Sequence, residues 1–142
     1  MELLPNIHLI EGVTSSAYLI VEPEGLTVID TGLPGGGDKI VRYLQRIGYE
    51  AGAVRRILLT HQHADHVGGA ARLAALSGAQ VIAHPLDAPA IEGAAPRELP
   101  HGMLRLVFQV AIVPRLAAVA VAQRVRQGET LPILASEGGL QV

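Results

Sequence analysis

Short apolar runs rich in β-branched residues alternate with segments of helical periodicity along this chain of 142 residues. Pro23-Glu24-Gly25 is a turn signal between two of the apolar runs, so residues 17–30 are predicted to form a β-hairpin. The alternation of the two patterns predicts an α/β fold. Strands are expected at residues 7–10, 17–22, 26–30, 55–60 and 80–83, and helices at 39–48 and 67–77.

Both predicted helices have recognisable ends. Asp38 is expected to cap the N-terminus of helix 39–48, which ends at Gly48. Helix 67–77 ends at Gly78. The residues expected to face the core are Ile40, Val41, Leu44 and Ile47 in the first helix, and Ala70, Leu73, Ala74 and Leu76 in the second.

Residues 103–122 form the most apolar stretch of the chain. Two arginines and a central proline, Arg105, Arg115 and Pro114, make a membrane span costly here, so no membrane partner is expected. The pattern instead predicts a kinked pair of helices that pack over the core or over a pocket. Packing within the core or between two copies of the chain is an equally weighted alternative.

Composition restricts the possible functions. The length fits one domain, residues 1–142, and the net charge of −2 argues against a nucleic-acid partner held by a basic face. Charged residues make up only 17% and the mean hydropathy is +0.35, so we expect apolar surface to be buried against a second copy or a further segment. The absence of cysteine excludes disulfides and thiolate zinc sites. The N-terminus has no secretory signal pattern, so a cytoplasmic location is expected.

The sequence Leu-Thr-His-Gln-His-Ala-Asp-His-Val-Gly-Gly, residues 59–69, contains the strongest candidate chemistry. Imidazole nitrogens and carboxylate oxygens are donors that zinc prefers. The cluster follows a predicted strand, so it is expected at the C-terminal end of that strand, where ligands collect in α/β folds. The alternative is a surface turn that is merely rich in histidine. The four candidate metal ligands are His61, His63, Asp65 and His66.

The spacing of these residues suggests which of them bind the same metal ion. His61 and His63 are two positions apart, so in an extended segment their rings point to the same side and can bind one metal ion. Asp65 and His66 come where the chain turns and can reach a second position beside the first. The two glycines that follow allow a tight bend and close packing of the next helix.

Residues 60–69 resemble the signature of the metallo-β-lactamase superfamily, His-x-His-x-Asp-His after a strand. Val-Ile-Asp-Thr-Gly at 28–32 resembles the upstream strand of that family, and Ala-Tyr-Leu-Ile-Val at 17–21 resembles the strand before it. The resemblance covers about residues 7–92 in order.

The resemblance implies an αββα sandwich, a mixed α/β (α+β) fold, of which this chain holds roughly the first half. Residues 1–100 would form the first half with the metal loop, residues 101–127 an apolar helical segment, and residues 128–142 the start of the second half. Helical insertions at the place of 103–122 often shape the substrate entrance in that family.

The resemblance also implies roles for residues around the cluster. Asp30 would support the metal loop by hydrogen bonding, with Thr60 helping, because a carboxylate behind a ligating imidazole fixes its tautomer. A plain turn aspartate is the alternative for Asp30. His84 ends strand 80–83 on the same side, where a structural or rim role is favoured over a ligand role.

The expected ligand set is incomplete. The family has a further histidine, a metal-bridging aspartate and a last histidine downstream, and no such positions follow in this sequence. Glu129 and Glu137 are interpreted as turn residues. A second copy in a homo-oligomer, or a missing C-terminal segment, could complete the site.

The function indicated is a zinc-dependent hydrolase with up to two zinc ions, acting on an ester, thioester, lactone or similar bond of a small molecule. Metal-bound hydroxide would attack the substrate, and Asp65 would orient that water as the catalytic carboxylate. The alternative is a non-catalytic or self-associating fold with an incomplete metal site.

Overall fold

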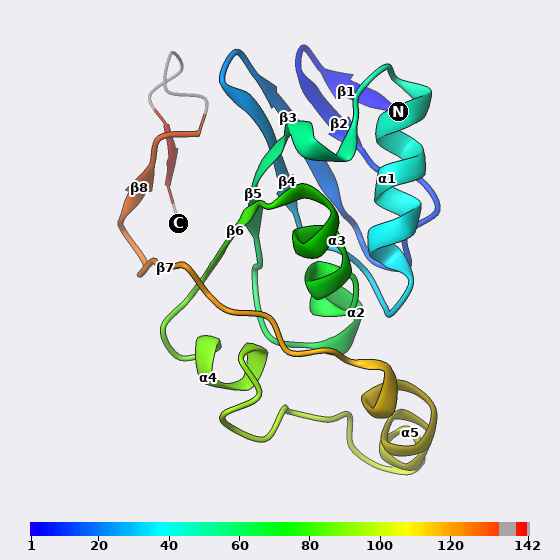
Figure 1. Ribbon diagram of the computed structural model, residues 1–142. Coiled ribbons are helices and arrows are strands. Elements are labelled where there is room, and N and C mark those ends of the chain that lie inside the picture. Colours follow the sequence, from blue (N-terminus) through cyan, green and yellow to red (C-terminus); the bar gives the residue numbers. More distant parts are fainter. Residues whose placement is uncertain (134–138, 142) are drawn as a thin grey trace.

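The computed structural model describes residues 1–133 and 139–141, and a sheet of seven strands lies at its centre in the order β1 to β7 (Figure 1). The first four strands pair antiparallel and β4 to β7 pair in parallel. The strands are β1 Glu2–Leu4, β2 Ile7–Leu9, β3 Tyr18–Glu22, β4 Gly25–Ile29, β5 Val54–Leu58, β6 Gln80–Ala83 and β7 Gln123–Arg124. A mixed sheet with crossover helices is the α/β architecture that the sequence predicts.

The predicted hairpin is confirmed, since β3 and β4 pair antiparallel from Tyr18 opposite Ile29 to Glu22 opposite Gly25. Helix α1, Gly36–Arg46, connects β4 to β5, and the helical segment that ends with α3, Ala70–Ser77, connects β5 to β6. Parallel neighbours need such crossovers, because the chain must return to the same end of the sheet.

Helices α1 and α3 lie side by side on one face of the sheet (Figure 1). Alternate strand residues point to that face and form the main core with the helices. The opposite face carries a smaller core, to which the two-stranded ribbon of β8, Thr130–Leu131, and β9, Leu140–Gln141, contributes. The main core includes Leu19, Val28, Ile57, Ile40, Leu44 and Leu73, and the smaller core includes Ile20, Leu58, Ile82, Val125, Leu131 and Ile133.

The ends of the helices differ from the prediction. Helix α1 begins at Gly36 rather than residue 39, and Gly35, with φ of 94°, takes the capping position. The expected N-cap, Asp38, lies instead in the first turn and pairs with Arg72 of α3 at 2.9 Å. Glycine at position 35 favours a helix that begins at Gly36, because only a residue without Cβ adopts a positive φ at little cost.

The second predicted helix, 67–77, is divided in two. Helix α2, Ala64–Val67, contains part of the histidine cluster, and α3 begins only at Ala70. Leu73 is buried as expected, but Leu76 is 39% exposed and does not face the core. The break falls at Gly68 and Gly69, and glycine has a low helix propensity.

The apolar stretch 103–122 is not a pair of helices. Helix α5, Met103–Val107, continues through a π-helical turn, Phe108–Ile112, and a 3-10 turn, Val113–Arg115. The chain is then extended up to β7 and forms backbone hydrogen bonds to α4, Ala88–Ile91, and to β6. Pro114 favours this ending, since it has no N–H for a longer helix.

The pattern predicts packing over the core or over a pocket, and the outer side chains of this stretch do not pack on the core. Met103 and Leu106 of α5 and Val110 of the π-helical turn are 87%, 64% and 71% exposed, respectively. No helix in the described part of the chain combines the length and the apolar composition that crossing a bilayer requires.

The last segment contains one turn that the sequence predicts. Glu129 accepts a hydrogen bond from the backbone N–H of Arg126, and its own N–H donates to the Arg126 carbonyl. Its interpretation as a turn residue is therefore confirmed. Glu137 lies outside the residues that the structure describes.

Candidate metal centre

The candidate site lies where β4 and β5 end. These strands are parallel, so their carboxyl ends meet at one edge of the sheet. Asp30 directly follows β4, and the segment from Thr60 to His66 follows β5 through the buried Leu59. Residues 30 positions apart in sequence are therefore neighbours in space.

All four predicted ligands are brought together here. The ring centroids of His61 and His66 are 4.0 Å apart, and those of His61 and His63 are 4.7 Å apart with nearly perpendicular planes. Asp65 lies beside them, with its Oδ2 at 3.4 Å from Nε2 of His66.

The chemistry of this donor set fits a zinc-type ion, since it combines three imidazoles with a carboxylate. The arrangement is not a complete coordination shell. Within residues 1–133 and 139–141, no three histidine, cysteine, aspartate or glutamate side chains have the geometry to hold a metal ion together.

Asp30 supports the segment from Thr60 to His66 through hydrogen bonds. Its carboxylate accepts hydrogen bonds from the Thr60 backbone N–H at 2.9 Å and from the Thr60 hydroxyl at 2.7 Å. Oδ2 also contacts Nδ1 of His66 at 2.8 Å. In a neutral imidazole that bond requires a proton on Nδ1, which leaves the Nε2 lone pair directed away from Asp30 and available to a metal. These contacts favour the supporting role over a plain turn aspartate.

Asp30 has an unusual environment for a carboxylate. The residue is 3% exposed, and its backbone has a φ of 58°, which is uncommon outside glycine and is most tolerated by Asn and Asp. Three hydrogen bonds compensate its burial.

Sequence reasoning assigned no role to Thr31, which fixes the other side of the loop. Its hydroxyl donates to the carbonyl oxygen of His66 at 2.8 Å, and its N–H donates to the same oxygen at 2.7 Å. The Thr31 hydroxyl also accepts from the Gly69 N–H at 3.2 Å. Ser15 donates its hydroxyl to the carbonyl oxygen of Asp65 and holds the loop from a third segment.

Gly68 and Gly69 allow this close packing. A Cβ on Gly69 would lie 2.4 Å from the backbone nitrogen of Gly37 in α1, and a Cβ on Gly68 would lie 2.4 Å from the nitrogen of Pro34. Real Cβ atoms do not approach so closely, so these positions require glycine. The sequence correctly indicated close packing here but could not identify the partner segment.

A loop from the second half of the chain borders the cluster. Glu98 lies 3.7 Å from Nε2 of His63, and its backbone N–H donates to the Gln62 side chain at 3.2 Å. Asp87 accepts a hydrogen bond from the Gln62 N–H at 3.2 Å. Nothing in the local sequence around residues 87 and 98 indicates these contacts, because they depend on where the loop returns.

An open cleft of about 890 Å³ lies in front of His63 and Asp65. Leu99 and two residues of the apolar stretch, Leu104 and Phe108, line its other side. This placement favours the entrance role that the family resemblance implies for the stretch over plain core packing.

His84 lies at the end of β6, next to a separate cavity of about 330 Å³ that Thr60 also lines. Its Nδ1 accepts a hydrogen bond from the Leu86 N–H at 3.2 Å. This contact agrees with a structural or rim role.

Burial lowers the pKa of His61 below its ordinary value of 6.5. The neighbouring imidazoles of His66 and His63 lower it further, while Asp30 and Asp65 partly oppose the change. The neutral ring is the form that binds metal ions, so the local electrostatics favour metal binding over protonation.

The fold and this edge of the sheet define the class of protein, and comparison with known proteins agrees. The family model of the metallo-β-lactamase superfamily matches residues 10–132, so the chain belongs to that superfamily. The predicted family is thus confirmed, as is the α/β sandwich fold in incomplete form.

Particular relatives fall into two groups. A hydroxyacylglutathione hydrolase of Albidiferax ferrireducens is 35% identical over 120 residues, which are 82% of this chain and 44% of that protein. Among solved structures, a metallo-β-lactamase with an HARLDQ motif from Cronobacter sakazakii matches 92% of this chain and 49% of its own, with a TM-score of 0.76 and 27% identity. The subclass B3 metallo-β-lactamase BJP-1 of Bradyrhizobium japonicum matches 92% and 46%, with a TM-score of 0.73 and 28% identity. The chain therefore spans about half the length of the relatives it matches.

Proposed function

We propose that this chain contributes the metal loop of a zinc-dependent hydrolase. The observation that supports the proposal most directly is the convergence of His61, His63, Asp65 and His66 above the buried Asp30. The superfamily and its hydrolase relatives support the reaction class.

His61 and His63 would bind one zinc ion, and Asp65 and His66 would bind a second. When bound, zinc lowers the pKa of a coordinated water and polarises the bond to be cleaved. Each pair supplies only two protein ligands, and a catalytic zinc normally has three. Groups from a second copy or from a further segment would complete each set.

The chain's own residues would position the reactants. Asp65 borders the open cleft and would hold the attacking water and accept its proton. Asp30 and Thr60 hold the loop that carries the histidines, so their role is to fix ring orientation. The apolar wall of Leu99, Leu104 and Phe108 would receive the less polar part of a substrate.

A thioester or ester of a small molecule is the substrate class we favour. A hydroxyacylglutathione hydrolase is 35% identical to the chain over 82% of its residues, which supports this class. An acylated glutathione is a thioester, whereas a β-lactam is a cyclic amide.

The test combines metal content with hydrolysis. The purified chain, loaded with zinc and desalted, is expected to retain about two ions per chain and to hydrolyse an S-acyl glutathione faster than a β-lactam. His61→Ala is expected to abolish the hydrolysis and lower the zinc content. His8→Ala, which changes a histidine on β2 remote from this edge, is the matched control and retains both.

A second candidate is a non-catalytic, self-associating module. It is favoured by the absence, among the described residues, of three groups that could hold an ion, and by the exposed apolar side chains of α5. Substoichiometric zinc that a weak chelator removes, without hydrolysis, would support this candidate and contradict the first.

A further inference from the structure

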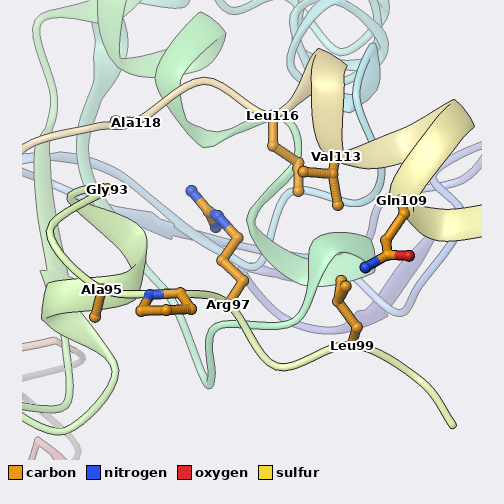
Figure 2. A pocket seen from close by; sticks show the side chains of 9 residues that line it. Gly93, Ala95, Arg97, Leu99, Gln109, Val113, Leu116 and Ala118 are labelled. Atoms are coloured by element: carbon orange, nitrogen blue, oxygen red, sulfur yellow. The ribbon is translucent and has the colours of Figure 1, made fainter. Parts of the chain in front are cut away.

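A third cavity, of about 390 Å³, lies between residues 93–99 and 109–118 (Figure 2). Its walls are largely apolar and include Pro96, Val113 and Leu116. Among the described residues that line it, Arg97 alone carries a charge. Such a cavity with one charged group can hold a small amphipathic ligand.

Arg97 lacks a full set of partners. Its Nη2 donates to the Ile91 carbonyl at 3.3 Å, but Nη1 is buried and has no hydrogen-bond partner. No Asp or Glu in residues 1–133 or 139–141 forms an ion pair with it. Figure 2 shows the guanidinium extending from its loop toward the segment that carries Leu116 and Ala118. A charged donor without a partner is costly to bury, so an anion beside the guanidinium would be favoured.

We propose that this cavity binds a small carboxylate with a short apolar chain, and that the carboxylate pairs with the Arg97 guanidinium. The planar guanidinium matches a carboxylate through two parallel hydrogen bonds. The apolar walls would receive the chain of the ligand. Nη1 is shielded from solvent, so pairing requires a rotation about the flexible side-chain torsions of Arg97.

Two further observations agree with an anion of low charge. Burial lowers the pKa of Arg97, so an anion beside it would oppose the cost of keeping the guanidinium charged. Besides Arg97, Gln109 is the side chain in the lining that offers amide donors. A phosphate dianion would need more donors than these to replace its water shell.

The cavity borders the metal loop in space, but its proposed ligand needs none of the metal-loop residues. Glu98, the next residue, contacts His63, and Leu99 lines both this cavity and the cleft. The proposal goes beyond the hydrolase function and does not rest on it, since carboxylate binding requires neither metal nor turnover.

The test is a titration of the metal-free full chain with sodium hexanoate, followed by amide NMR shifts. Saturable shifts are expected at Gly93, Arg97 and Ala118. Hexanol, the neutral analogue, is expected to bind at least about tenfold more weakly.

Arg97→Met is expected to weaken hexanoate binding by at least about tenfold and to remain folded, because an apolar side chain replaces an unpartnered charge. Arg105→Met, which removes an exposed arginine of α5, is the matched control and leaves the affinity unchanged. Arg97→Lys keeps the charge and retains part of the affinity.

Three outcomes would overturn the proposal. The first is equal hexanoate affinity of the Arg97→Met variant, and the second is hexanol binding as tight as hexanoate. The third is displacement of hexanoate by equimolar inorganic phosphate, which would assign the site to a different anion.

Discussion

At the scale of single residues, Asp30 organises the candidate site. It is the first residue after β4, and it accepts hydrogen bonds from both donors of Thr60 as well as contacting His66. One buried carboxylate thus fixes the end of β5 and the orientation of a proposed metal ligand. A substitution that keeps the shape of the Asp30 side chain but removes a hydrogen-bond acceptor should disturb both the end of β5 and the orientation of His66.

We expect Asp30→Asn to lower the free energy of unfolding by about 1–3 kcal/mol, because its amide group cannot accept from Thr60 and His66 together. Zinc affinity should fall by about 10- to 100-fold. Asparagine tolerates the positive φ, so backbone strain is not a competing cause. Denaturant unfolding and a zinc competition titration measure the two effects.

The control for that change is Asp38→Asn. Asp38 pairs with Arg72 on the surface, where an ion pair contributes about 0–1 kcal/mol. Equal effects of the two substitutions on zinc affinity would contradict the role given to Asp30.

Tyr43 of α1 gives a residue-scale prediction that is independent of metal. Its buried hydroxyl is hydrogen-bonded to Nδ1 of His8 on β2. Burial raises the pKa of Tyr43 above its ordinary value of 10.0, and Glu11 raises it further. Above about pH 10 the folded chain therefore retains a proton that the unfolded chain loses, so the free energy of unfolding decreases as the pH rises.

The difference in tyrosinate absorbance between the wild-type chain and Tyr43→Phe isolates this group. We expect the difference to titrate above pH 10.0, and Tyr43→Phe to reduce the loss of stability in alkali. A midpoint at or below the ordinary value would show that the hydroxyl is not buried in solution.

At the scale of elements, the contact of α1 with the start of α3 positions the metal loop. Gly37 and Gly69 allow the two backbones to meet, and Thr31 ties the same region to His66. The loop is therefore held from β4 by Asp30 and Thr31, and from α1 by close packing.

Gly69→Ala is expected to destabilise the chain by about 1–3 kcal/mol, because the added Cβ would lie 2.4 Å from the Gly37 nitrogen and 2.6 Å from the Thr31 carbonyl oxygen. The φ of Gly69 is −93°, so alanine is not strained by its backbone conformation. Thermal or denaturant unfolding measures the effect. Gly52→Ala, with open space around its Cβ, should change stability by less than about 0.5 kcal/mol.

At the scale of the whole molecule, the chain covers about half of its relatives and leaves apolar surface exposed. The exposed side chains of α5 and the turn after it form one apolar group next to the cleft: Met103, Leu104, Leu106, Val107 and Val110. Apolar groups of this kind usually mark an association surface. Of the two coverings that the composition allows, a second copy or a further segment, we propose that a second copy of the chain covers this group.

The double variant Leu106→Lys/Val110→Lys is expected to weaken self-association by at least about tenfold in Kd, measured by sedimentation velocity over a range of concentrations. These residues are four apart on one helical face, so the two charges would repel those of a second copy. Leu86→Lys, at an exposed leucine outside the group, is the control. An unchanged distribution of oligomers would contradict association through this group.

The sequence by itself determined the features that depend on short spacing. The β3–β4 hairpin follows from two apolar runs around Pro23-Glu24-Gly25, and the histidine cluster follows from residues within six positions of one another at a strand end. Neighbouring residues have few possible arrangements, so their pattern alone indicates their geometry.

Only the tertiary structure decided which distant residues meet. The Thr31 bonds to His66, the Glu98 contact with His63, and the approach of Gly37 to Gly69 all join segments more than 30 residues apart. It also decided that α1 begins at Gly36 and that α5 remains exposed, because both depend on what packs beside them. Such contacts arise from chain return and competition for buried surface, and no local pattern encodes them.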